Sequence, residues 1–264
     1  MDLLLKGKRA LVTGSSSGIG WATARELAAE GAHVVLNGRD PSRLASAVVR
    51  IQAELPVAMV EGVAADLSTA AGCQRLLDAA GEIDILVNNL GIFEPKPFEQ
   101  IGDDDWTRFF EVNVMSGVRL SRHHLARMNA RNWGRIVFIS SESGICPPGD
   151  MVHYGMSKSA QLSVSRGLAE TCIGTGVTVN SVLPGPTRTE GVGEFFATLA
   201  RDAGKSLAET EHDFFKFARP TSLLQRFIEP TEVAAMVTYI CSPRSAATNG
   251  AALRVEGGVV RSLI

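Results

Sequence analysis

The residues best suited to acid–base chemistry in this 264-residue chain are Tyr154 and Lys158, which stand four positions apart. Residues at i and i+4 share one face of a helix, so the spacing predicts that the lysine ammonium lies beside the phenol. A positive charge within about 4–6 Å would lower the tyrosine pKa from its ordinary value near 10. With Ser141 thirteen positions upstream, the pattern predicts a proton-transfer site. The pair alone is also typical of an ordinary helix surface.

A glycine-rich segment near the start of the chain predicts a phosphate site. The apolar run 9–13 precedes Gly14 to Gly20, and a helical pattern from about Trp21 to Glu30 follows, closing at Gly31. This order brings backbone amides and the positive end of a helix dipole to the loop, where they attract a pyrophosphate. Glycines also serve ordinary turns, so the position between strand and helix is what indicates a nucleotide.

The end of the second predicted strand indicates which nucleotide. Neither Asn37 nor Gly38 is acidic, so no carboxylate there would bond a ribose 2′-hydroxyl or repel a 2′-phosphate. Arg39 follows directly and favours NADP(H). NAD(H) stays open as the other cofactor, because Ser17 supplies no second cation and a solvated loop arginine would look the same.

Further motifs follow in a fixed order. In chain order, the set is Thr13–Gly20, Asp66, Asn88–Gly91, Asn113, Ser141, Tyr154 with Lys158, and Asn180–Gly185. With all of these in place, the chain resembles the short-chain dehydrogenase/reductase family over nearly its whole length. It departs from the family pattern at Leu90 and Glu256, where alanine and aspartate are usual. Leu90 leaves the size of the substrate open.

The resemblance implies a role for each catalytic residue. Tyr154 resembles the general acid that protonates a carbonyl oxygen during reduction, and the base in the reverse direction. Lys158 is similar to the lysine that holds the nicotinamide ribose and lowers the tyrosine pKa. Ser141, or Ser140 if the register is off by one, resembles the donor to the substrate oxygen. Asn113 resembles the asparagine that kinks its helix and positions a water in the proton path.

The resemblance also implies a cofactor site with four parts: a pyrophosphate loop, an adenine pair, a ribose pair and a segment that fixes the nicotinamide carboxamide. Asp66 is alternatively a helix cap before Ser68, and Pro184 with Gly185 an ordinary strand exit. The pyrophosphate loop is Gly14, Ser16, Ser17, Gly18, Ile19 and Gly20, the adenine pair is Asp66 and Leu67, and the ribose pair is Asn88 and Gly91. The carboxamide segment is Pro184, Gly185, Thr187 and Thr189, and Arg39, Tyr154 and Lys158 complete the site.

Alternating apolar runs and helical patterns predict the elements that position these residues. The alternation is typical of βαβ units, and it predicts an α/β chain: a single-domain, doubly wound Rossmann fold over residues 1–264. Its mainly parallel seven-stranded sheet has helices on both faces, with ligands at the carboxyl ends of the strands. The strands are predicted at 8–13, 32–37, 57–61, 83–88, 134–140, 176–182 and 251–255.

One stretch, 187–229, interrupts this rhythm. It holds six of the chain's 11 phenylalanines. Long insertions in compact domains are usually functional, so we expect a substrate-binding lid with an apolar wall. The alternative is that these rings anchor the lid helices to the core or to a neighbouring subunit.

Composition and helix patterns limit the classes of partner that the chain could bind. A net charge of −2 offers no basic stripe for nucleic acid or an anionic membrane, and no apolar run approaches 18 residues. Four cysteines without a CxxC pair or metal spacing predict reduced, intracellular thiols and no metal site. Only three successive leucines stand near the N-terminus, too few for a signal core, so we expect a soluble, cytoplasmic protein. The long helix from Asp103 to about Arg131, with the Tyr154 helix, resembles the family's dimer contact. This resemblance implies a homotetramer or homodimer, and the alternative is a monomer in which these helix faces are solvated.

The predicted function is hydride transfer between NADP(H) and a carbonyl or secondary alcohol. A 3-oxoacyl thioester, a sugar or polyol, a steroid-like alcohol and a small ketone all stay open as substrates, because fold cannot choose among them. The alternative is a non-catalytic dinucleotide-sensing or scaffold protein on the same fold. Enoyl reduction is disfavoured, because the tyrosine and lysine would then stand farther apart.

Overall fold

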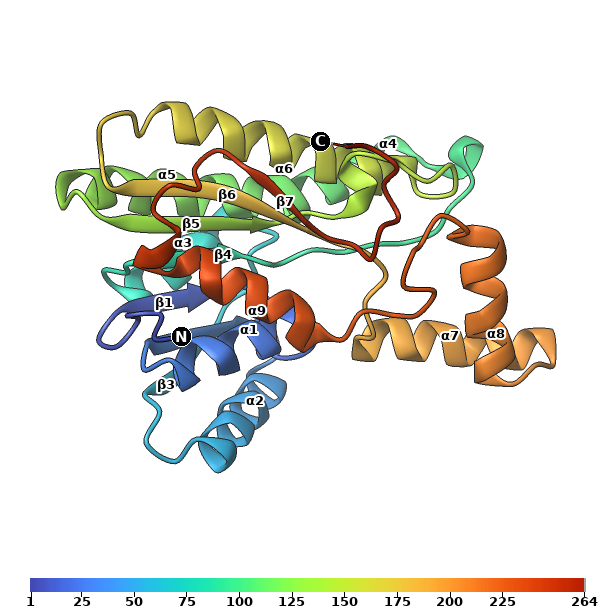
Figure 1. Ribbon diagram of the computed structural model, residues 1–264, viewed down its shortest axis with the longest axis horizontal. Helices are drawn as coiled ribbons and strands as arrows, with labels where there is room; N and C mark the ends of the chain where they lie inside the picture. The colour runs from blue at the N-terminus through green and yellow to red at the C-terminus, as the bar shows by residue number, and fades with distance from the viewer. Residues whose placement is uncertain (264) are drawn as a thin grey trace.

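Seven parallel strands form one sheet in the computed structural model, which describes residues 1–263 (Figure 1). The strand order is β3-β2-β1-β4-β5-β6-β7, so the order reverses between β1 and β4 and leaves a crevice at their carboxyl ends. This confirms the predicted doubly wound α/β fold. The strands are β1 Arg9–Val12, β2 His33–Gly38, β3 Val60–Ala64, β4 Ile85–Asn88, β5 Gly134–Ile139, β6 Val177–Pro184 and β7 Ala252–Val255.

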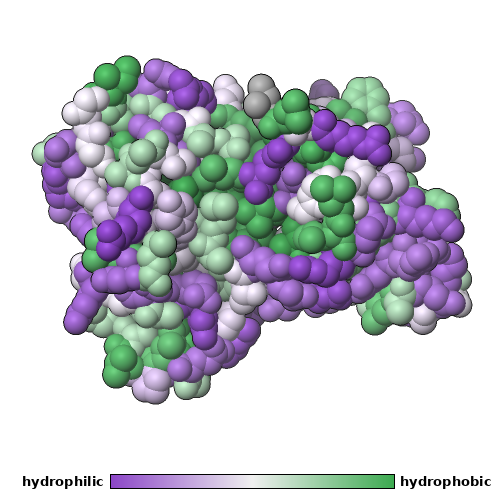
Figure 2. Space-filling view, viewed as in Figure 1, coloured by the Kyte–Doolittle hydropathy of each residue, from purple (hydrophilic) through white to green (hydrophobic). Residues whose placement is uncertain are grey.

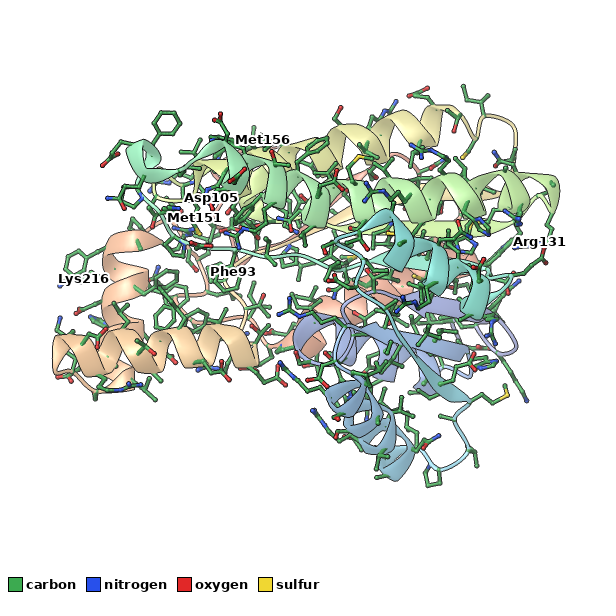
Figure 3. The ribbon with its side chains drawn as sticks, turned by 180° about the vertical axis from the view of Figure 1, so that it is seen from behind. Phe93, Asp105, Arg131, Met151, Met156 and Lys216 are labelled. Atoms are coloured by element: carbon green, nitrogen blue, oxygen red, sulfur yellow. The ribbon has the colours of Figure 1, made fainter. Side chains whose placement is uncertain are left out.

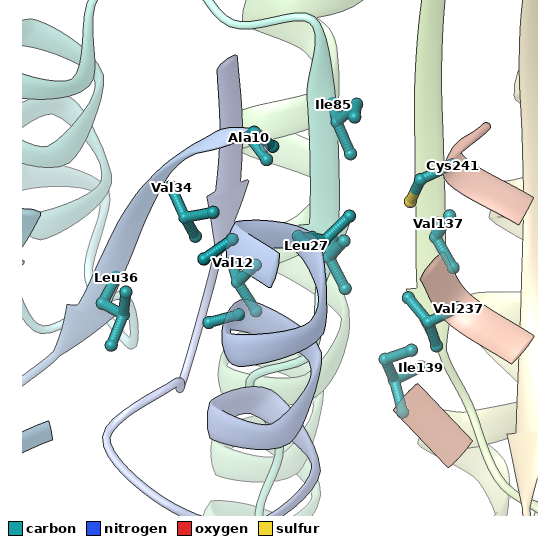
Figure 4. Packing of buried hydrophobic residues seen from close by; sticks show 14 of the residues in the cluster. Ala10, Val12, Leu27, Val34, Leu36, Ile85, Val137, Ile139, Val237 and Cys241 are labelled. Carbon is teal, nitrogen blue, oxygen red and sulfur yellow. The ribbon is translucent and has the colours of Figure 1, made fainter. Parts of the chain in front are cut away.

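Helices cover both faces of the sheet. Leu27 of α1 and Val237 of α9 belong to one buried cluster, and Leu76 of α3 and Leu120 of α5 to the other. In Figure 4 the first cluster lies between α1, α9 and the strands, with Val12 and Val137 from β1 and β5. The helices are α1 Gly18–Ala29, α2 Pro41–Glu54, α3 Ala70–Ala80, α4 Asp103–Phe109, α5 Ser116–Ala130, α6 Val152–Glu170, α7 Glu190–Ala203, α8 Leu207–Asp213 and α9 Pro230–Cys241.

Two element boundaries differ from prediction. The third strand occupies Val60–Ala64 and not 57–61, because Leu55 ends α2 and the chain turns before the strand, leaving Val57 almost fully exposed. The first helix begins at Gly18, three residues earlier than predicted, so it takes in the last glycines of the loop. Its end at Ala29 and the positive φ of Gly31 match the expected helix stop.

The lid region leaves the body of the molecule after β6. Its helices α7 and α8 project beyond the carboxyl end of the sheet in Figure 1. A π-helical turn, Phe214–Ala218, follows α8, and a parallel bridge between Thr187 and Ile228 closes the base of the segment. The lid has a small core of its own, formed by Phe196, Phe215 and Phe227.

Candidate active site

A cavity of about 430 Å³ opens where the carboxyl end of the sheet meets the lid. Figure 2 shows apolar residues gathered there, between the sheet and the lid helices. Twelve of the residues predicted from sequence line it, drawn from five separate segments of the chain. They are Ser17, Gly18, Ile19, Gly20, Gly91, Ser141, Tyr154, Lys158, Pro184, Gly185, Thr187 and Thr189.

The glycine loop is held in shape by close contacts to its main chain that leave no room for side chains. Asn89 Nδ2 donates to the carbonyls of Thr13 at 2.9 Å and Gly14 at 3.0 Å. A Cβ at Gly20 would stand 2.4 Å from Asn89 Nδ2 and 2.5 Å from the Gly14 carbonyl oxygen. Glycine is therefore required here by close packing of the loop on the start of α1.

The N-terminus of α1 already behaves as an anion site. Ser17, at the N-cap, makes no side-chain cap, and the Gly18 amide donates to the Glu190 carboxylate at 2.9 Å. A carboxylate bound to the Gly18 amide shows that this helix end accepts a negative group. The loop thus fits the pyrophosphate of a dinucleotide.

Arg39 is an uncommitted cation at the adenosine end of the site. Arg39 is exposed just after β2, and it makes no ion pair or side-chain hydrogen bond within residues 1–263. The neighbouring Asp40 does not neutralise it, because its carboxylate accepts from the amides of Ser42 and Arg43 as the N-cap of α2. Arg39 is free to meet a 2′-phosphate.

Several predicted cofactor residues lie outside the cavity. The Asp66 carboxylate accepts from the Ser68 amide at 3.0 Å, as in the alternative cap interpretation, and Leu67 is buried in the core. The Asn88 side chain donates to Ser121 on α5, so it faces into the fold and not toward a ribose. Its neighbour Asn89 takes the cavity position that sequence reasoning gave to Asn88.

The lysine of the proposed acid–base pair is buried beneath the cavity. Lys158 Nζ donates to the Ile139 carbonyl at 2.9 Å and lies 5.6 Å from the centre of the Tyr154 ring. A Cβ at Gly91 would approach Nζ to 3.2 Å, so glycine keeps this space open. Burial lowers the pKa of Lys158 to about 8, partly offset by the negative charge of Glu142.

The predicted effect on Tyr154 is wrong in this structure. Its pKa is raised and not lowered, first because burial disfavours the phenolate and second because of the Glu142 carboxylate. A hydrogen bond with Ser141 and the charge of Arg219 act in the opposite direction and are outweighed. Tyr154 is therefore a neutral phenol at pH 7, the form that can give a proton.

Ser141 stands at the carboxyl end of β5 and has two further partners. Its Oγ accepts from the Ser143 amide at 3.1 Å, and its hydroxyl donates to Glu142 Oε2. The neighbouring Ser140 donates to the Lys158 carbonyl at 2.9 Å and so serves the attachment of α6. Ser141, not Ser140, is in contact with Tyr154.

Asn113 lies in a π-helical turn, Phe110–Met115, between α4 and α5. The predicted long helix is thus one run with a bulge at the predicted kink. Asn113 Oδ1 accepts from the Ile92 amide at 2.8 Å, and Nδ2 donates to Ser157 at 2.9 Å, beside Lys158. Its carbonyl accepts from Gln161 at 2.6 Å. Asn113 therefore positions α6 from behind and does not line the cavity.

The lid phenylalanines form part of the cavity wall, as predicted, and they pack on one another and not on the core of the sheet. Phe195, Phe196, Phe214 and Phe227 line the cavity, and the last three also pack on one another with ring centres 5.0–5.6 Å apart. Phe217 is exposed. On the opposite wall, Phe93 and Met151 lie between the lid and helices α4 to α6, as Figure 3 shows from behind.

Sequence reasoning missed Glu142, Arg219 and Glu190. Glu142 is 5% exposed and faces Arg219 across 3.4 Å. The one available signal was an acidic residue beside the catalytic serine. Arg219 and Glu190 carried none, because a loop arginine and a glutamate at a helix start are ordinary features. Only tertiary contact brings Arg219 to the cavity and Glu190 to the Gly18 amide.

Other predicted features appear as follows. All four cysteines are free, and three of them are buried. The helices in residues 1–263 include none whose length and apolar character suit a membrane span. No cluster of three or more His, Cys, Asp or Glu suited to a metal occurs in that range either.

Comparison with known proteins yields one family. The family model described as short chain dehydrogenase matches residues 8–200. An uncharacterized oxidoreductase of Bacillus subtilis (strain 168), YvaG, is 51% identical over 263 residues and covers the full length of both chains. The 3-oxoacyl-[acyl-carrier-protein] reductase FabG of Aquifex aeolicus (strain VF5) is 32% identical, over 98% of this chain and all of its own.

Among solved structures, an L-sorbose reductase from Gluconobacter frateurii, complexed with NADPH and L-sorbose, is similar over the full length of both chains. The TM-score is 0.94 and the sequence identity is 32%. This similarity includes the lid region, which lies beyond the end of the family-model match at residue 200.

Proposed function

The chain belongs to the short-chain dehydrogenase family, and on that premise we propose that it transfers a hydride between NADP(H) and a carbonyl or secondary alcohol. One observation carries the proposal: the hydroxyls of Ser141 and Tyr154 meet in the same cavity as an anion-binding helix end. The NADPH of the sorbose reductase and the free Arg39 support the choice of cofactor.

The cofactor residues are assigned by position. The amides of Ser17, Gly18 and Ile19 would hold the pyrophosphate, and Arg39 the 2′-phosphate. Lys158 and Gly91 would meet the nicotinamide ribose, with Tyr154 beside them. The segment at Pro184, Gly185, Thr187 and Thr189 would hold the carboxamide. When bound, the nicotinamide supplies or accepts the hydride.

The chemistry of this chain's own residues follows from their protonation states. Tyr154, neutral at pH 7, gives its proton to the carbonyl oxygen during reduction. Ser141 donates a second hydrogen bond to that oxygen as negative charge develops. Lys158 holds a buried ammonium beneath the site, and Asn113 fixes the helix that carries both Tyr154 and Lys158.

The test is Tyr154→Phe. We expect kcat to fall by about 10³-fold, because the general acid is lost, while the Kd for NADPH, measured by fluorescence titration, stays unchanged. A wild-type rate in this variant would reject the assigned acid. Tight NADPH binding by the wild type, without turnover of any ketone or alcohol in a broad panel, would favour the non-catalytic sensing function instead.

Assembly and location extend the proposal. A groove of about 440 Å³ between α5 and α6 is lined by Val118, Leu125, Val164 and Leu168, all partly exposed. Such a face supports a homotetramer or homodimer, which light scattering would detect as a multiple of the 28.1 kDa chain. The free cysteines, Cys146 among them exposed, support a reducing cytoplasm.

A further inference from the structure

The Glu142 carboxylate lies against the catalytic serine but takes no part in the proton transfer described above. Its side chain is 7% exposed and lines the cavity. One oxygen, Oε1, faces Arg219, whose Nε and Nη2 both lie 3.4 Å away. The other oxygen, Oε2, accepts the hydroxyl proton of Ser141. Within residues 1–263, Ser141 is the one donor that reaches Oε2.

The one proton of Ser141 is therefore already donated. A hydroxyl has one proton to give and two lone pairs that accept. The proton goes to Glu142, and one lone pair takes the Ser143 amide. In this state Ser141 has nothing to donate to a substrate oxygen.

Binding of a ketone forces an exchange. For Ser141 to donate to the carbonyl oxygen, its proton must leave Glu142 Oε2. The buried carboxylate oxygen then has no donor, which opposes productive binding of any substrate that cannot replace it. A substrate with its own hydroxyl beside the carbonyl can supply that donor, because the two oxygens of such a group are neighbours.

We propose that the preferred substrate is a ketone with a hydroxyl on the carbon next to the carbonyl, and that Glu142 selects it by accepting that hydroxyl. This rests on the proposed function. In reduction, the carbonyl carbon takes the hydride of NADPH and the carbonyl oxygen takes the Tyr154 proton. A vicinal diol and NADP⁺ result. Arg219, half-buried and paired with Oε1, holds the carboxylate in place.

The rest of the cavity favours an apolar remainder on this substrate. Away from Glu142 and Arg219, the substrate end is walled by Phe93, Met151 and the lid phenylalanines. A ligand site of this kind uses a few polar groups to orient a mainly apolar molecule. Glu142 thus fixes one end of the substrate and the rings receive the other.

Two matched ketones test the proposal. 2-Hydroxyacetophenone and propiophenone differ only by hydroxyl against methyl on the carbon beside the carbonyl. With the wild type and NADPH, we expect kcat/KM to favour the hydroxyketone by at least about 10²-fold. Equal values for the two ketones would overturn the inference and leave the proposed reductase function standing. Turnover of neither these two nor any other carbonyl would instead reject the proposed function.

Glu142→Gln separates recognition from a structural role. The amide keeps the shape of the side chain but lacks the charge, and a neutral hydrogen bond holds Ser141 less firmly. We expect kcat/KM to fall for 2-hydroxyacetophenone and to rise or hold for propiophenone, so that the preference drops below about tenfold. A purely structural role would lower both rates together and would overturn the assignment.

Glu211→Gln is the control. Glu211 is also paired with an arginine of the lid segment, Arg188, but it lies outside the cavity. The same loss of charge there should leave the preference for the hydroxyketone unchanged. Thermal unfolding of both variants without cofactor verifies that each is folded. A preference lost equally in both would overturn the role of Glu142.

Discussion

The nucleotide end of the cavity is built from main-chain atoms, whereas the substrate end is built from side chains. At the first end, Gly20 and the amides at the start of α1 make the surface, and Asn89 holds the carbonyls of Thr13 and Gly14. At the second end, Glu142 and Arg219 come from segments 77 positions apart. Main-chain geometry follows from local sequence, while a side-chain pair needs the whole fold. The variants below probe each end in turn.

The largest expected effect falls on the main-chain end. In Gly20→Ala, the new Cβ would stand 2.5 Å from the Gly14 carbonyl oxygen, and backbone cannot move aside as a flexible side chain can. We expect NADPH affinity to fall by more than about 100-fold, and the free energy of unfolding to fall by about 1–3 kcal/mol. Fluorescence titration and thermal unfolding measure the two effects.

A glycine of the lid provides the matched comparison. Gly193 lies in α7, and a Cβ there meets no atom within 4 Å. Gly193→Ala should therefore leave NADPH affinity intact and slightly stabilise the helix. If Gly20→Ala bound NADPH as tightly as this control, close backbone packing would not be what shapes the nucleotide end.

At the side-chain end, Ser141→Ala removes the second donor to the substrate oxygen. We expect kcat to fall by about 10²–10³-fold with the Kd for NADPH unchanged. The neighbouring Ser140→Ala removes only the bond to the Lys158 carbonyl, so it should lower stability by about 1 kcal/mol and leave most of kcat. If steady-state kinetics showed the large loss of kcat in Ser140→Ala and not in Ser141→Ala, Ser140 would be the donor to the substrate oxygen.

Lys158→Met tests the burial of the ammonium. The pKa of Lys158 is about 8 in the folded protein and about 10.5 when unfolded, so holding the charge at pH 7 costs about 3 kcal/mol. The variant loses the bond to Ile139 but also this penalty. We expect it to be about 1–3 kcal/mol more stable than the wild type at pH 7, and to lose activity.

The stability difference between the wild type and Lys158→Met should depend on pH. The folded protein binds fewer protons than the unfolded chain between about pH 8 and 10.5, so wild-type stability should rise through that window relative to Lys158→Met. Below about pH 8 the difference is constant. Urea unfolding at several pH values measures it, and a parallel pH course for the two proteins would show that the lysine is not buried with its charge.

The same contrast between the two ends explains what could be predicted from sequence. The parallel seven-stranded sheet, the glycine loop and the positions of Tyr154 and Lys158 follow from spacing and periodicity, and the structure brings the loop and the two residues to one edge of the sheet. The raised pKa of Tyr154 could not be predicted, because burial and the charge of Glu142 depend on tertiary packing. Asn88 was misplaced by one position, since β4 turns alternate side chains to opposite faces.

The smallest expected effect is on cofactor choice at the nucleotide end, where the Arg39 side chain supplements the main-chain contacts. Arg39→Ala should weaken NADPH binding by about tenfold and leave NADH unchanged, because only NADPH carries the 2′-phosphate that an exposed guanidinium can meet. Added salt should reduce the wild-type preference, as screening predicts for an exposed charge. Arg50→Ala is the control, since Arg50 stacks on Trp21 and should not affect either cofactor. Equal losses for NADPH and NADH would show that Arg39 does not read the phosphate.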